Sequence, residues 1–219
     1  MKPEFITYQK FNDIALANEL IDVLKKHHIK YLMEEESLTF DPSYSFNPLA
    51  KDYAVKINNT DFERVNKILQ AEENEEITDL DKDYYLLSFT DDELMEVVTK
   101  ADEWSAFDVV LARKILAEKG KNLTDEAIAA INEKRIEELK VPDPPQTLWI
   151  IIGYIFAFTG GLLGLFIGWY LLSFKKTLPD GERVYEYSAR DRKHGRMIFY
   201  ISIAAFALAL FYKFGVLFH

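Results

Sequence analysis

Residues 148–174 read LWIIIGYIFAFTGGLLGLFIGWYLLSF and contain no charged side chain. A second apolar run, residues 197–218, is interrupted by a single charge, Lys213. Because a helix rises about 1.5 Å per residue, ~20 apolar residues are enough to cross the hydrocarbon core of a bilayer. Each run therefore predicts a transmembrane helix, and residues 148–219 predict a transmembrane helix pair.

The segment that joins the two runs, residues 175–196, is rich in basic residues. It contains seven bases and four acids. A short basic loop is typical of the cytoplasmic side of a membrane, where its cations meet lipid headgroups. We expect headgroup contacts from Lys175, Lys176, Arg190, Arg192, Lys193 and Arg196.

This basic loop conflicts with two simple crossings, which place it on the side opposite the N-terminal part of the chain. The first ten residues lack the apolar core of a signal peptide, so we favour two crossings with the N-terminal part in the cytoplasm. The alternative is a first segment that turns at Thr159, Gly160 and Gly161. Each arm would then be ~20 Å long, which is short of the ~30 Å core.

Three glycines of the first apolar run, Gly160, Gly164 and Gly168, recur at every fourth position. Small residues at this spacing share one helical face and let another helix approach closely in lipid. We favour packing within the helix pair, against small residues of the second run. A homo-oligomer or a larger membrane complex is the alternative.

The charge of the chain is unevenly distributed. Residues 1–140 contain 31 acids and 18 bases, a net charge of −13, whereas the remaining residues have a net charge of +3. Nucleic-acid binding needs clustered Lys and Arg, so we expect no nucleic-acid partner. The absence of cysteine excludes disulfides, thiolate catalysis and cysteine metal sites.

No pattern of residues predicts catalysis. His27 and His28 are adjacent, so on a helix they point about 100° apart and cannot hold one metal ion together. Asp102, Glu103 and Asp108 have no further ligands at a fixed spacing, and acids also favour helix starts. We therefore expect no catalytic residue, no metal, no cofactor and no enzymatic activity.

Apolar periodicity predicts an α+β chain with a β-α-β-β-α-β order in residues 1–88. This order is typical of the ferredoxin-like fold, in which two helices cover one face of a four-stranded antiparallel sheet. The four predicted strands cover residues 4–8, 29–35, 52–58 and 84–89. A three-helix module at 89–140 and a proline-rich linker at 141–147 follow.

Several stretches of the first 70 residues resemble a known family. They are Phe5-Ile6-Thr7-Tyr8, the helix at 15–24 leading to Ile29-Lys30-Tyr31, and Val55-Lys56-Ile57 followed by 61–69. In these stretches the chain resembles a family of prokaryotic signal-transducing proteins, whose small domain is similar to nitrogen-regulatory PII-like domains. The resemblance implies regulation or ligand sensing at the bacterial inner membrane.

In PII-like domains the connection between the second and third strands contacts partners. Here this connection is residues 37–50, and the resemblance implies a ligand- or partner-binding role for Phe40, Tyr44 and Phe46. The alternative, which we favour, is that these aromatic residues fold back over the sheet and complete a small core.

These observations predict a membrane-anchored regulatory or adaptor protein whose cytoplasmic PII-like module binds a small ligand or a protein partner. The expected partners are membrane lipid and a membrane or cytoplasmic protein. The alternative is an accessory structural subunit of a membrane complex that packs through the glycines of the first transmembrane helix.

Overall fold

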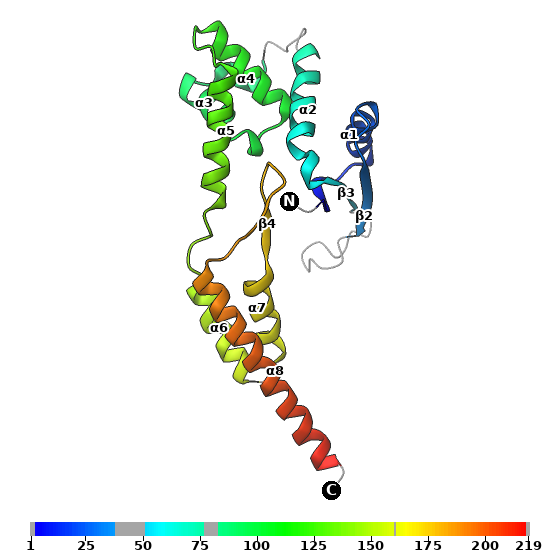
Figure 1. Cartoon of the computed structure of the whole chain (residues 1–219), viewed down its shortest axis with the longest axis vertical. Helices are drawn as coiled ribbons and strands as arrows, with labels where there is room; N and C mark the ends of the chain where they lie inside the picture. Colours follow the sequence, from blue (N-terminus) through cyan, green and yellow to red (C-terminus); the bar gives the residue numbers. More distant parts are fainter. Residues whose placement is uncertain (1–2, 38–50, 77–82, 160, 218–219) are drawn as a thin grey trace. The chain divides into compact units, whose positions relative to one another are not determined.

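The computed structural model describes four stretches of the chain, residues 3–37, 51–76, 83–159 and 161–217 (Figure 1). Most of these residues are helical, and two small sheets complete a mixed α+β structure, as predicted at that level. Contacts within the chain divide it into two units, Met1–Ile136 with Pro179–Glu182 and Glu137–Leu178 with Arg183–His219.

The first unit begins with a three-stranded sheet and two helices. Their bounds are β1 Phe5–Phe11, α1 Ile14–Lys26, β2 Tyr31–Ser37, β3 Lys51–Asn58 and α2 Phe62–Glu76. β3 lies between the other strands and is antiparallel to both, with Ile57 opposite Ile6 of β1 and Tyr31 of β2. β1, α1 and β2 form a split β-α-β unit with β3 between its two strands, and with α2 these elements follow the first five of the predicted order.

The core of this sheet follows from the periodicity of its elements. Val55 and Ile57 are two positions apart on β3, so their side chains share a face, and both are fully buried. Asp13 caps the start of α1, and its Oδ1 accepts a hydrogen bond from Ala15 N at 2.8 Å. It covers the sheet with four buried side chains at helical spacing, Ala17, Leu20, Ile21 and Leu24.

The prediction of a fourth strand at residues 84–89 is wrong. This stretch forms a single 3-10 turn, η2 (Tyr85–Ser88). Leu86 is fully buried in a second core, formed by helices, and Phe89 packs edge-on against Trp104. Burial among helices therefore overrides the strand propensity of these aromatic residues, and the ferredoxin-like sheet is not completed here.

Residues 89–140 contain three α-helices and one 3-10 turn, with bounds α3 Asp91–Thr99, η3 Ala101–Glu103, α4 Ala106–Glu118 and α5 Asp125–Lys140. Thr90 caps α3 through a reciprocal capping box with Glu93. α3 and α4 supply most of the second core. α5, in contrast, has no fully buried side chain.

The second unit contains three apolar helices and a small hairpin, with bounds α6 Thr147–Phe158, α7 Leu162–Ser173, β4 Lys175–Thr177, β5 Arg183–Tyr185 and α8 Ala189–Leu217. In the described residues one helix is long and apolar enough to cross a membrane, over Ala189–Lys213. The prediction that residues 148–174 form one spanning helix is wrong, because α6 and α7 are separate helices of twelve residues each.

The break between α6 and α7 has a local cause. Gly161 adopts φ of +80°, a left-handed conformation that residues with a Cβ rarely accept. Thr159 ends α6 with its backbone N–H bonded to Ile155 O. Each helix is then ~18 Å long, which is too short to span a ~30 Å hydrocarbon core alone.

Candidate membrane-binding site

Gly164 lies where α7 meets both other helices of the second unit. A Cβ at this position would lie 2.6 Å from the backbone N of Ala157 on α6 and 2.6 Å from Oγ of Ser202 on α8. Contacts this short leave no room for a side chain. Gly160, the first residue of the predicted glycine strip, lies outside the described residues.

Gly168 lies one turn further along α7 and faces α8. A Cβ there would lie 2.6 Å from Phe199 N and 2.8 Å from Gly195 O, both of which are backbone atoms. The glycines of α7 therefore bring three helices of one chain into close contact, as small residues do in membranes.

The turn between α6 and α7 reaches the middle of α8. A Cβ at Gly161 would lie 2.5 Å from Ser202 O and 3.1 Å from Phe206 N. Ser202 lies ~20 Å along α8 from Ala189, which is about half of the length of this helix. Within the second unit, α8 continues well past the turn (Figure 1).

The outer faces of these helices are apolar and exposed. Only 17% of the most apolar window of α8 is buried, whereas the core helix of a soluble protein is mostly buried. Water-soluble monomers rarely expose such large contiguous apolar surfaces. The exposed side chains include Ile151, Phe158, Leu163, Phe166, Leu208 and Phe211.

Hydrogen bonds hold the proline-rich linker against the basic segment at one end of this helical group. Asp143 N donates to Glu186 O at 2.8 Å, and Lys176 Nζ donates to Val141 O at 3.0 Å. Burial raises the pKa of the Glu186 carboxyl, and the nearby Asp143 carboxylate raises it further. The start of α6 and the end of α7 therefore lie at the same end of the helical group.

The start of α8 joins the same end. The Asp191 side chain is 1% exposed, and its Oδ2 accepts a hydrogen bond from Gln146 N, just before α6, at 3.3 Å. The exposed aromatic residues Trp149, Trp169 and Tyr170 also lie near this end, as aromatic residues at a membrane interface do. We refer to this end of the helical group as the polar edge.

The six predicted headgroup residues all lie at the polar edge. Lys176 forms an ion pair with Asp143 at 3.5 Å, and Lys175 precedes it on β4. The other four lie in the first two turns of α8, where Arg190, Lys193 and Arg196 are exposed and Arg192 is partly buried.

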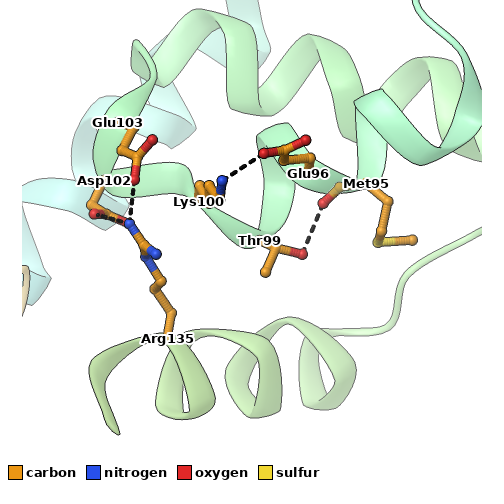
Figure 2. Close-up of polar contacts among 7 residues, drawn as sticks. All are labelled: Met95, Glu96, Thr99, Lys100, Asp102, Glu103 and Arg135. Atoms are coloured by element: carbon orange, nitrogen blue, oxygen red, sulfur yellow. Dashed lines mark hydrogen bonds and ion pairs between the residues drawn. The ribbon is translucent and has the colours of Figure 1, made fainter. Parts of the chain in front are cut away.

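The acids around Trp104 have structural partners. Arg135 of α5 donates from Nε and Nη2 to both carboxylate oxygens of Asp102 at 2.8 Å, and from Nη2 to Glu103 (Figure 2). Ser105 caps the start of α4, and its Oγ accepts a hydrogen bond from Asp108 N at 3.0 Å. In the described part of the chain no group of three or more His, Cys, Asp or Glu residues could hold a metal ion.

The first unit carries an open groove of about 560 Å³ between the end of α1 and α2. Arg64 and Lys67 line it, and Nη2 of Arg64 donates to His27 O at 3.1 Å. A hydrogen bond from Lys26 lowers the pKa of the Glu72 carboxyl, and a hydrogen bond with His27 lowers it further. Burial of Glu72 acts in the opposite direction but is outweighed. No sequence motif marks this groove, because its residues come together only through folding.

Phe40, Tyr44 and Phe46, the aromatic residues of the predicted binding loop, lie outside the described residues. Their role stays a prediction.

No protein-family model, no curated protein and no solved structure matches this chain. The resemblance to prokaryotic signal-transducing proteins therefore stays a prediction.

Proposed function

We propose that this chain is a membrane-anchored regulatory or adaptor protein of the bacterial inner membrane. The observation that carries the proposal is the exposed apolar surface of α6, α7 and α8 beside the basic polar edge. An apolar band of this kind next to cations and aromatic residues suits the boundary between lipid tails and headgroups.

In this proposal the anchor is asymmetric. α8 crosses the bilayer, whereas α6 and α7 enter from one side, turn at Gly161 near the middle of α8, and return. The hydrogen bonds that hold the linker against residues 176 and 186 support this arrangement, because they keep both ends of the α6–α7 pair together. The basic loop and the N-terminal module then lie on one side, the cytoplasm, in agreement with the positive-inside rule.

The regulatory part of the proposal rests on the first unit. The groove beside α2 contains two permanent cations, Arg64 and Lys67, against one acid, Glu63. A small anionic ligand or an acidic segment of a protein partner suits this balance of charge. The anchor would keep a module with a bound ligand attached to the membrane.

The role of an accessory membrane subunit has less support. It requires the glycine face of α7 to be available to another protein. Gly164 and Gly168 instead contact Ala157, Ser202 and Phe199 of the same chain.

Extraction of membranes tests the anchor. We expect the full chain to stay with bacterial membranes through an alkaline carbonate wash and to be released by detergent. Recovery of folded protein in the carbonate supernatant would overturn the proposal.

Ligand screening tests the module. Full-length protein in detergent is heated with small anionic metabolites, and a ligand of the groove should raise the unfolding temperature. Arg64→Gln should abolish that shift, whereas Lys30→Gln, which removes an exposed cation outside the groove, should keep it. Shifts that survive Arg64→Gln would place the ligand elsewhere.

A further inference from the structure

Tyr185 of β5 is flanked by two cations at the polar edge. Lys175 Nζ lies 4.8 Å from the centroid of its ring, and Arg192 Cζ lies 3.9 Å from it. Tyr185 as a residue is 41% exposed. β4, β5 and α8 each contribute one residue to this group, which we call the Tyr185 cluster.

The Nε of Arg192 is buried and has no hydrogen-bond partner among the described residues. Because this atom is buried, a lipid phosphate would reach the guanidinium through its two Nη groups. The nearest acid in sequence, Asp191, turns inward and accepts from Gln146 N. Glu186, beside Tyr185, lies close enough to Asp143 for that carboxylate to raise its pKa.

Two further features favour an anion at this place. Arg192 lies in the first turn of α8, where the helix dipole favours negative charge, and the buried Asp191 is the acid of the same turn. The cluster also follows the end of α7, close in sequence to the exposed aromatic residues Trp169 and Tyr170. If α7 and α8 are embedded as proposed above, the cluster lies at the level of the lipid phosphates.

We propose that the Tyr185 cluster is a binding site for the phosphate of an anionic membrane phospholipid. Arg192 supplies a planar pair of donors that matches two phosphate oxygens, and Lys175 supplies a second charge. Tyr185 holds both cations in place through cation–π contacts, which reduces the side-chain entropy lost when the phosphate binds. This inference deepens the proposed membrane anchor and rests on it.

The test uses substitutions for which a specific site and a diffuse positive charge predict different losses of lipid binding. Native mass spectrometry of the full chain in detergent measures binding of phosphatidylglycerol and phosphatidylcholine. Arg192→Gln removes a charge from the cluster, and Lys193→Gln removes one from the neighbouring exposed position. Tyr185→Leu removes the ring and leaves the charge unchanged.

We expect the wild-type chain to prefer phosphatidylglycerol. Arg192→Gln should weaken phosphatidylglycerol binding by clearly more than the roughly fivefold that one basic residue contributes at an anionic surface. Tyr185→Leu should weaken it as well, and Lys193→Gln should cost no more than that roughly fivefold factor. Equal losses in Arg192→Gln and Lys193→Gln, with none in Tyr185→Leu, would overturn the site.

Two controls identify the source of a negative result. Flotation of each variant with phosphatidylcholine vesicles reports the anchor alone, so a chain that floats but lacks lipid preference contradicts only this inference. Arg192→Lys keeps the charge and loses the paired donors, and should also weaken binding if the site is specific. Displacement of phosphatidylglycerol by equimolar inorganic phosphate would assign the site to the free anion.

Discussion

Single glycines determine how closely the helices of the second unit approach each other. In an exposed helix, Gly168→Ala would stabilise by about 1 kcal/mol through helix propensity. Here the new Cβ would meet Phe199 N at 2.6 Å, and a backbone atom cannot move aside as a flexible side chain can. We expect a net loss of about 1–3 kcal/mol, the usual cost of overpacking, in unfolding of the full chain in detergent.

The matched control for this substitution is Phe166→Ala on the same helix, because Phe166 is 59% exposed and faces outward. It should change the free energy of unfolding little in detergent. Equal stability of Gly168→Ala and the wild-type chain would contradict the close packing of α7 on α8.

Asp108 links the stability of the helical module to pH. Its side chain is 7% exposed and accepts hydrogen bonds from Tyr84 Oη and Ser105 Oγ, both at 2.7 Å. Burial by itself raises the pKa of Asp108, but hydrogen bonds from Ser105, Tyr85 and Tyr84 outweigh it and leave the pKa below its usual range. The folded protein therefore binds this proton less readily than the unfolded chain.

The sign of the pH dependence follows from that lowered pKa. The stabilisation is fully present above the ordinary pKa of about 3.9 and is lost as pH falls through the lower folded value. Hydrogen exchange of α4, corrected for the intrinsic effect of pH, should show weaker protection in acid. Asp108→Asn should reduce protection at neutral pH and remove the acid-dependent part, and an unchanged pH profile would contradict this account.

At the scale of elements, a shielded ion pair joins α5 to η3. α5 has no fully buried residue, and Arg135 joins it to η3 through Asp102 and Glu103 (Figure 2). Arg135 and Asp102 are 14% and 18% exposed, so this pair is shielded from water more than a typical surface ion pair. We expect Arg135→Met to speed hydrogen exchange throughout α5 and to leave α4 protected.

Lys100→Met is the control, since it removes an exposed ion pair between Lys100 and Glu96 at the end of α3 in the same region (Figure 2). It should leave α5 exchange unchanged, because exposed pairs of this kind contribute about 0–1 kcal/mol. Slow exchange of α5 in Arg135→Met would show that other contacts hold the helix.

The two wrong predictions from the sequence concern residues 148–174 and 84–89. In both stretches, contacts with residues elsewhere in the chain decide the conformation. Hydropathy locates residues 148–174 as apolar, but whether they form one helix or two depends on contacts with α8, which lies beyond them in the sequence. In the sequence, Gly160 and Gly161 indicated a turn. The alternative in which the first apolar segment turns there was ranked second, because each of its two arms is too short to cross the bilayer. At residues 84–89 the strand propensity is real, yet burial of Leu86 among helices decides the conformation.

Other elements were predictable because their signals are local. The alternation in β3 and the capping box at Thr90 each lie within a few residues of sequence, and both occur in the structure. The six basic residues of the polar edge were also recognisable from composition. The Tyr185 cluster was not, because it joins residues from three elements that a sequence pattern cannot align.

At the scale of the whole molecule, the turn between α6 and α7 predicts which parts of the chain share a side of the membrane. The α6–α7 pair turns back, so the N-terminal module and the basic loop should share one side, and the end of α8 should lie on the other. Two full crossings would instead separate the module from the loop.

The most direct test places single cysteines at Asn18, Thr177 and Lys213 in this cysteine-free chain and labels intact bacteria with a membrane-impermeant maleimide. All three side chains are exposed. We predict that Lys213→Cys reacts in intact cells, and that Asn18→Cys and Thr177→Cys react only after lysis. Labelling of Thr177→Cys in intact cells, with Asn18→Cys protected, would contradict the account.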